Sequence, residues 1–250
     1  MILSKYSANG NDFIIFHSDV KDDRIKLAIE LCNRQDGIGA DGLIVIVPHD
    51  TYDFEWQFYN SDGSTAEMCG NGTRACAHYA FVHGLAPKNM SFLTKAGIIK
   101  AEVDADCSNS GMVLSELTPP LIIDKDIIYN KKSWWLINTG VPHLVSFTNN
   151  IEEFDLADAR DLRYIYNSNV NIVFIDGKNL KVRTYERGVE DETLACGTGM
   201  AACYYRALCE NKIDKKVKVY PKSGDTLYLG MNDRTITFKG RVKNTFNTEW

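Results

Sequence analysis

The sequence Cys69-Gly70-Asn71-Gly72-Thr73-Arg74-Ala75-Cys76 has a second copy, Cys196-Gly197-Thr198-Gly199-Met200-Ala201-Ala202-Cys203. Both copies read Cys-Gly-x-Gly-x-x-Ala-Cys, and they lie about half the chain length apart. Each follows a predicted strand, which ends at Tyr59-Asn60 in the first half and at Tyr185-Glu186 in the second. Such a repeat predicts two structurally similar halves. We expect each half to contain a helix that begins directly after a cysteine, and the halves to face each other about a pseudo-twofold axis.

The position of Cys69 and Cys196 before a helix suits acid and base chemistry. The glycines allow a ligand to approach the backbone, and the first N–H groups of a helix suit a carboxylate. The helix dipole lowers the pKa of a thiol from about 8.5 toward neutrality. Two facing thiols could invert a stereocentre, because one thiolate removes the α-proton and the opposite thiol returns a proton to the other face. The N–H groups of both helices would stabilise the charge that grows on the substrate carboxylate.

The other cysteines have a structural interpretation, since a lone cysteine is most often a small buried apolar residue. The chain has seven, which are Cys32, Cys69, Cys76, Cys107, Cys196, Cys203 and Cys209. We expect Cys32, Cys76, Cys203 and Cys209 to be packing residues and Cys107 to be incidental. A disulfide between Cys69 and Cys196 stays open as an alternative to catalysis.

The composition of the chain is that of a globular protein. It has 250 residues, 44% hydrophobic and 24% charged, with a net charge of −5, which excludes disordered and collagen-like classes. A basic stripe is absent, so neither nucleic acid nor membrane is an expected partner. The odd number of cysteines and the lack of a secretory signal favour the cytoplasm. No nucleotide-binding fingerprint and no metal-ligand spacing occur, so we expect no cofactor and no metal.

The pattern of apolar residues and turns predicts many short strands and few helices, an α+β fold. Predicted helices cover residues 22–32, 70–83 and 197–210. Asp22 is expected to cap the first, whose apolar face holds Ile25, Ala28, Ile29 and Cys32. Predicted strands cover residues 3–6, 12–16, 43–47, 53–59, 91–94, 98–103, 111–114, 134–138, 144–147, 170–175, 180–185, 217–220, 226–229, 235–238 and 242–246. Thr118-Pro119-Pro120 is the best boundary signal, because two prolines favour an extended linker.

Motifs along nearly the whole chain resemble those of the diaminopimelate epimerase family. They are Gly10-Asn11-Asp12-Phe13, Asn33-Arg34 with Gly37-Ile38-Gly39, Asn60 with Asp62-Gly63-Ser64, Met68-Cys69-Gly70-Asn71-Gly72, Gly140 with Pro142-His143, Asn169-Val170-Asn171, and Tyr185-Glu186-Arg187-Gly188 leading to Ala195-Cys196-Gly197-Thr198-Gly199. The chain departs from the family pattern at Ala8, Gly42, Val141 and the longer loop 188–193. These departures concern contact details and leave both cysteine loops intact.

The resemblance implies a role for each matching residue. Cys69 and Cys196 are the implied acid/base pair, with His143 in support near the reacting centre. Gly70, Asn71, Gly197 and Thr198 would hold the reacting carboxylate. Asn11, Asn60 and Asn171 would orient the substrate through amide hydrogen bonds. Glu186, a further catalytic candidate, would accept bonds from a substrate ammonium group, and Arg187 would pair with the distal carboxylate.

The resemblance also implies a fold and a reaction. Two pseudo-symmetric domains, each a curved and mostly antiparallel sheet around a central helix, would cover residues 1–117 and 118–241, with 242–250 returning to the first. The implied reaction is the cofactor-independent conversion of LL-2,6-diaminopimelate to the meso form by a homodimer. A proline racemase-like enzyme, a non-catalytic amino-acid binding protein and a thiol redox protein remain as alternatives.

Overall fold

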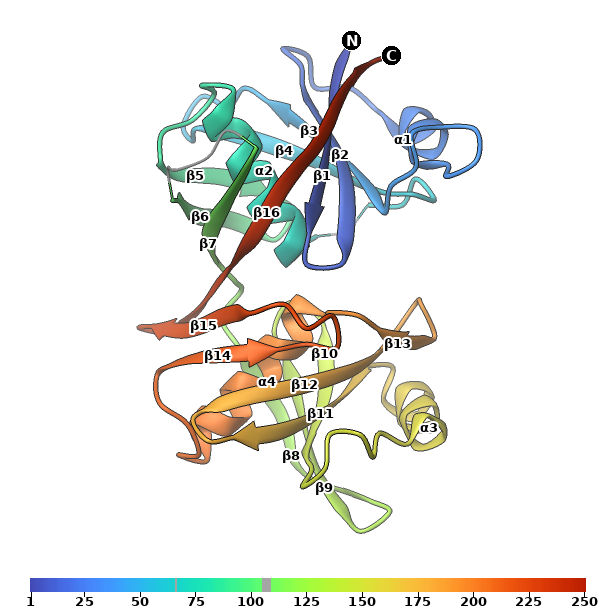
Figure 1. Cartoon of the computed structure of the whole chain (residues 1–250), viewed down its shortest axis with the longest axis vertical. Coiled ribbons are helices and arrows are strands. Elements are labelled where there is room, and N and C mark those ends of the chain that lie inside the picture. The colour runs from blue at the N-terminus through green and yellow to red at the C-terminus, as the bar shows by residue number, and fades with distance from the viewer. Residues whose placement is uncertain (66, 105–108) are drawn as a thin grey trace. The chain divides into compact units, whose positions relative to one another are not determined.

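The structure, a computed structural model, describes residues 1–65, 67–104 and 109–250, so Cys107 lies outside the described residues. The chain forms two compact units (Figure 1). Unit 1 comprises Met1–Glu116 and Lys239–Trp250, and unit 2 comprises Leu117–Phe238. Each unit is a curved, mostly antiparallel sheet with a helix against it, so the α+β class is confirmed.

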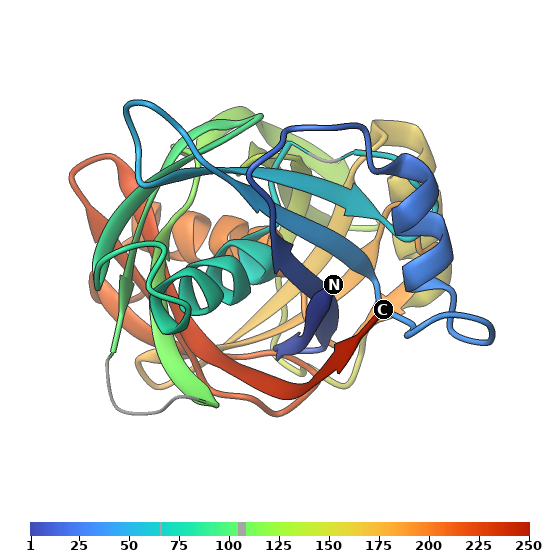
Figure 2. The ribbon, with the colours of Figure 1, turned by 90° about the horizontal axis from the view of Figure 1, so that it is seen from above.

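Unit 1 is a closed ring of strands around one helix. Its elements are β1 (Ile2–Ala8), β2 (Asn11–His17), α1 (Ile25–Cys32), β3 (Gly42–Val47), β4 (Phe54–Asn60), α2 (Gly70–Val82), β5 (Asn89–Thr94), β6 (Gly97–Val103), β7 (Ser110–Glu116) and the end of β16 (Thr235–Glu249). The strands pair in chain order from β1 to β7, then β7 pairs with β16 and β16 with β1. Helix α2 lies within this ring (Figure 2). Every residue from Gly70 to Ala80 is buried, as expected for a helix that is surrounded by protein.

Unit 2 follows a similar order of elements. They are β8 (Leu121–Tyr129), β9 (Lys132–Asn138), β10 (Pro142–Phe147), α3 (Leu156–Tyr166), β11 (Asn169–Asp176), β12 (Asn179–Glu186), β13 (Asp191–Thr193), α4 (Gly197–Cys209), β14 (Lys216–Tyr220), β15 (Leu227–Asn232) and the start of β16, with β8 and β13 as additions. In unit 1, α1 and α2 join the parallel pairs β2–β3 and β4–β5. In unit 2, α3 and α4 join the parallel pairs β10–β11 and β12–β14. The two halves therefore share the same topology around their two helices.

Some details differ from the expectations. Residues 235–238 and 242–246 form one continuous strand, because β16 pairs first with β15 and then with β7 and β1. Neither β8 nor α3 was predicted. Helix α3 carries its own end signals, however: Asp155 accepts bonds from the N–H groups of Ala157 and Asp158, and Asn167 ends it with a left-handed φ of 48°.

Three expectations about side chains were wrong. Helix α1 begins at Ile25 with Arg24, not Asp22, as its cap residue. Ile25 and Ile29 are 41% and 46% exposed, and Leu31 packs in the core in their place. Cys209 is exposed, because it lies at the last position of α4, whereas Cys32, Cys76 and Cys203 are buried. Within the described part of the chain, no helix has the length and apolar character needed to cross a bilayer.

Candidate active site

Cys69 is the cap residue of α2 and has extended backbone angles, φ −142° and ψ 106°. Its Sγ accepts a hydrogen bond from the Gly72 N–H at 3.3 Å. The first intrahelical bond runs from Thr73 N–H to the Cys69 carbonyl at 2.8 Å. The N–H groups of Gly70 and Asn71 come before that bond, in the positions of a helix that have no intrahelical acceptor. They can therefore donate to an anion beside the thiol.

A chain of amides lies behind the first turn of α2. Asn71 Nδ2 donates to Asn11 Oδ1 at 2.7 Å, and Asn11 Nδ2 donates to Asp41 Oδ2 at 2.9 Å. Asp41 Oδ1 in turn accepts a hydrogen bond from Arg34 Nη2 at 2.8 Å, which makes an ion pair. The structure thus brings Asn11 and Asn71 into direct contact, and each holds the other's amide in a defined orientation.

Asn60 ends β4, on the strand that precedes α2. Its Nδ2 donates to Ser64 Oγ at 2.9 Å, and its backbone N–H donates to the Ser64 carbonyl at 2.7 Å. Gly63 gives this turn its positive φ of 83°, a conformation that glycine adopts without strain. The side chain is half-buried at the end of the strand, as expected for a group that a rigid element positions.

Cys196 is the cap residue of α4 and has nearly the same backbone angles, φ −122° and ψ 110°. Its Sγ lies 3.5 Å from Thr198 Oγ1, and that hydroxyl lies 2.9 Å from His143 Nε2. The first intrahelical bond, from Met200 N–H to the Cys196 carbonyl, is 2.9 Å. The N–H groups of Gly197 and Thr198 precede it, so unit 2 has the same potential anion site as unit 1.

The Asn171 amide determines the tautomer of His143. Asn171 Nδ2 faces the Leu144 carbonyl at 2.9 Å, and a carbonyl only accepts, so this atom is the donor. The same Nδ2 lies 3.1 Å from His143 Nδ1, which therefore accepts. The proton of neutral His143 is thus on Nε2 and is donated to Thr198 Oγ1, whose own hydrogen can point to Cys196 Sγ.

His143 stays neutral at ordinary pH. Burial, together with the nearby Arg187 cation, lowers its pKa to about 3, although the bond with Asn171 acts in the opposite direction. Asn171, expected to contact the substrate, is fully buried, and its Oδ1 accepts from Thr184 Oγ1 at 2.8 Å. In this structure its amide is held by protein groups and orients the histidine.

Glu186 and Arg187 lie at the end of β12, both half-buried. Glu186 Oε2 accepts from Thr193 Oγ1 at 2.7 Å. The Arg187 backbone N–H donates to Asn169 Oδ1 at 2.8 Å, and its Nη1 donates to the Asn167 carbonyl at 2.9 Å. Anchored in this way, the pair differs from a solvated surface pair.

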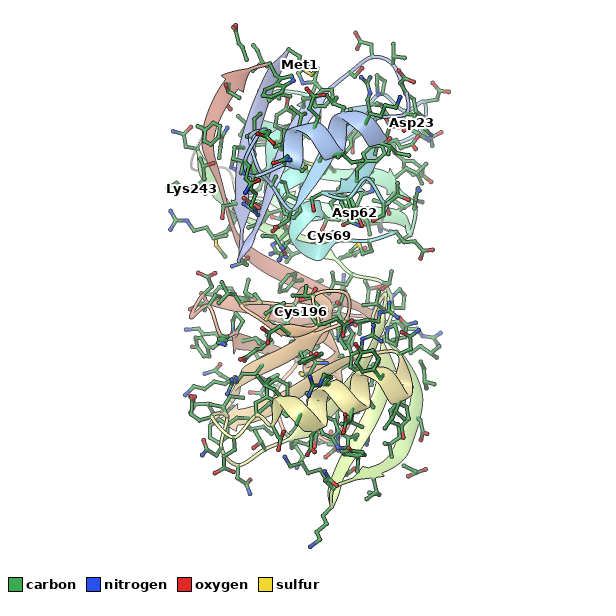
Figure 3. The ribbon with its side chains drawn as sticks, turned by 90° about the vertical axis from the view of Figure 1, so that its right-hand side faces the viewer. Met1, Asp23, Asp62, Cys69, Cys196 and Lys243 are labelled. Atoms are coloured by element: carbon green, nitrogen blue, oxygen red, sulfur yellow. The ribbon has the colours of Figure 1, made fainter. Side chains whose placement is uncertain are left out.

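The expected residues therefore form two groups, one in each unit. Unit 1 holds Asn11, Asn60, Cys69, Gly70 and Asn71; unit 2 holds His143, Asn171, Glu186, Arg187, Cys196, Gly197 and Thr198. Figure 3 labels Cys69 and Cys196, each at the start of its helix. Sequence reasoning missed Asp41, Thr184 and Arg74. Among the described residues, no three His, Cys, Asp or Glu side chains are grouped to hold a metal ion, and no cysteine takes part in a disulfide.

Solved structures of similar fold come from several enzyme families. A probable proline racemase from Agrobacterium radiobacter aligns with a TM-score of 0.79 at 13% identity, covering 100% of this chain and 92% of that one. A phenazine biosynthesis protein of the PhzF family from Bacillus anthracis aligns with a TM-score of 0.74 at 16% identity, covering 100% and 98%. At such identities the likeness shows the shared fold alone.

Sequence comparisons decide between these families. The model of the family described as diaminopimelate epimerase matches residues 3–121 and 135–242. Proteins named diaminopimelate epimerase are similar over nearly their full length: one from Nitratiruptor sp. is 59% identical, covering 99% of this chain and 98% of that protein. One from Campylobacter jejuni is 53% identical, covering 98% and 97%, and one from Helicobacter pylori is 42% identical, covering 97% and 94%. With both cysteine loops intact, this chain belongs to the diaminopimelate epimerase family.

Proposed function

We propose that the chain converts LL-2,6-diaminopimelate to the meso isomer without a cofactor, with Cys69 and Cys196 as the acid/base pair. The observation that carries the proposal is the duplicated cap position. Each unit places one cysteine thiol next to backbone N–H groups that precede the first intrahelical bond. Membership of the family supplies the substrate, because its relatives are named for diaminopimelate.

In the proposed reaction one thiolate removes the α-proton and becomes a thiol. The electron pair of the broken C–H bond delocalises into the substrate carboxylate, whose growing charge receives bonds from the helix N–H groups. The second thiol donates its proton to the opposite face of the carbon and becomes a thiolate. The reaction therefore requires both thiols to reach the same carbon from opposite sides when the substrate is bound.

His143 supports this chemistry through Thr198. Because neutral His143 donates to Thr198 Oγ1, the threonine hydroxyl is free to donate to the Cys196 thiolate. We propose Asn171 as the residue that fixes His143, in addition to its implied place near the substrate.

The distal end of the substrate carries a second ammonium and a second carboxylate. We propose that Glu186 accepts from the ammonium group and that the Arg187 guanidinium pairs with the carboxylate. Asn60 and Asn11 would orient the same ligand from unit 1. This charge pattern suits a substrate with two amino-acid ends better than the monocarboxylate imino acids of proline racemase-like enzymes.

The test is conversion of LL-diaminopimelate, followed by chiral chromatography with reduced protein and no added pyridoxal phosphate or metal. We expect wild-type protein and the Cys209→Ser control to form the meso isomer. Cys69→Ala and Cys196→Ala should each lose at least a thousandfold in kcat. Wild-type turnover by Cys196→Ala would contradict the assignment. Binding of diaminopimelate by wild-type protein without any inversion would instead select a binding protein.

Two further expectations accompany the function. We propose that the chain works as a homodimer in the cytoplasm, where the free thiols stay reduced. Light scattering of the reduced protein at micromolar concentration should give about twice the 28.2 kDa chain mass.

A further inference from the structure

Arg74 is the largest of the fully buried side chains, with no exposed surface. It lies in α2, five residues after Cys69, inside the ring of strands of unit 1. Its guanidinium donates to three oxygens at the start of the helix. These are the Gly70 carbonyl at 2.9 Å, Asn71 Oδ1 at 2.6 Å and Asn9 Oδ1 at 2.8 Å. The cation is thus attached to the turn that carries the thiol.

All three acceptors are neutral, so they bond the Nη1 and Nη2 groups without cancelling the charge. Burial lowers the pKa of Arg74 to about 9, and the Cys69 thiolate opposes this lowering. The side chain therefore remains a cation at neutral pH. A buried cation is costly unless it is paired or hydrogen-bonded, and the bonds to the start of α2 meet that need here.

The second copy of the repeat shows that this helix start does not need an arginine. Ala201 occupies the position in α4 that Arg74 occupies in α2. Helix α4 nevertheless begins with the same cap geometry and has the same length of 13 residues. The guanidinium is accordingly an addition specific to the Cys69 turn.

We propose that Arg74 is a positioning residue for Cys69, a buried cation that stabilises the Cys69 thiolate and fixes the Asn71 amide toward Asn11. The Asn71 Oδ1 accepts from Arg74, so its Nδ2 must face Asn11 Oδ1, as observed. The consequence of this arrangement for catalysis rests on the proposed function, whereas the effect of Arg74 on the ionisation of the Cys69 thiol does not.

Other titratable side chains on α2 and on the strands packed against it include tyrosines, a cysteine and histidines. Burial raises the pKa of Tyr6 on β1 and of Cys76, and raises that of Tyr79 to about 12. His78 lies 3.1 Å from Tyr6, and His17 of β2 lies 2.9 Å from Tyr79.

Asp41 and Asp12, two aspartates of unit 1, are each paired with a cation. Asp41 reaches the helix through Asn11 and is paired with Arg34, and Asp12 is paired with Arg34 and Lys5. Glu67, two residues before Cys69, is exposed to solvent. Arg74 is thus a buried cation that is hydrogen-bonded directly to the turn carrying Cys69.

The test is the pH dependence of alkylation by iodoacetamide, with Cys69 and Cys196 peptides quantified separately by mass spectrometry in one sample. It needs no substrate, so it is independent of whether the chain is an epimerase. At pH 7 we expect Arg74→Met to slow the alkylation of Cys69 at least tenfold and to change that of Cys196 less than twofold. At a pH above the alkylation midpoints of both proteins, the rates of wild type and variant should agree, which separates ionisation from access. Arg74→Lys, which keeps the charge, should restore the rate at pH 7 to within threefold of wild type.

An unchanged Cys69 rate in a folded Arg74→Met protein, as judged by circular dichroism, would overturn the proposal. If that variant does not fold, the pH midpoint of Cys69 alkylation in the wild-type protein provides the test. A Cys69 midpoint well below the value of about 8.5 for a free cysteine supports the proposal, and a midpoint at or above it contradicts the proposal. If alkylation responds as expected but no diaminopimelate is inverted, the proposed function fails and the role of Arg74 stands.

Discussion

The first turns of α2 and α4 share one sequence pattern but differ in the groups that surround the cysteine thiol. Both cysteines cap their helices with extended backbone angles. Cys69 Sγ accepts from the Gly72 N–H, with a buried arginine behind it. Cys196 Sγ instead meets the Thr198 hydroxyl, with a neutral histidine behind it. The repeat thus preserves the backbone, while the electrostatics of the two thiols have diverged.

The largest expected difference between the two turns is in packing at the second glycine. A Cβ at Gly199 would lie 2.3 Å from Asn171 Oδ1, whereas a Cβ at Gly72 would lie 3.3 Å from the Cys69 Cβ. Gly199→Ala should therefore lower the free energy of unfolding by about 3 kcal/mol and Gly72→Ala by about 1 kcal/mol or less. Urea unfolding measures both. Equal losses would show that the two turns are not packed differently.

A second difference is the response to acid. The pKa of His143 is about 3 in the folded protein, below its ordinary value of 6.5, so its stabilising effect is complete above pH 6.5 and is lost as the pH falls. Between pH 6.5 and pH 5 the free energy of unfolding should therefore fall by about 2 kcal/mol. For Asp12 of unit 1, burial raises the pKa, but the bonds from Arg34 and Lys5 more than offset it and lower the pKa to about 2. The contribution of the Asp12 carboxylate to the free energy of unfolding is therefore lost only as the pH falls below 3.8.

Urea unfolding of wild type and His143→Gln at pH 7, 6 and 5 checks this order. The variant should begin less stable and should lose about 2 kcal/mol less than wild type between pH 7 and pH 5. Parallel profiles would show that His143 does not control the acid response.

The smallest expected effect concerns the hydroxyl beside Cys196. Thr198→Val keeps the shape and removes the group that lies 3.5 Å from Sγ and 2.9 Å from His143 Nε2. Without this donor, the midpoint of Cys196 alkylation should rise by about one pH unit, the value of one charge-assisted hydrogen bond. The Cys69 midpoint should stay constant in the same sample. A shift in both would mean that the two thiols are coupled.

The sequence was sufficient for features set by local pattern. Duplicated Cys-Gly turns predicted α2 and α4 to within one residue at their ends, since the signal at each helix start is local. Helix α3 was missed although Asp155 and Asn167 cap it, because its sequence is polar and the apolar face is short. The single strand β16 was read as two, because its continuity depends on partners in both units.

Side-chain networks could not be predicted in the same way. The tautomer of His143 depends on Asn171, 28 residues away, and on the Leu144 carbonyl that orients that amide. Arg74 is visible in the repeat only as a mismatch with Ala201, and its importance appears once the helix is inside the ring. Such contacts depend on tertiary packing and not on local spacing.

The most direct test of the two-thiol account is α-deuterium uptake during inversion in deuterated water. We expect the meso isomer formed from LL-diaminopimelate by reduced wild-type protein to carry deuterium at the inverted carbon, because the proton is delivered by a thiol that exchanges with solvent. The Cys69→Ala/Cys196→Ala double variant should show neither exchange nor inversion. Meso isomer that retains its original α-hydrogen, or exchange that persists in the double variant, would contradict the account.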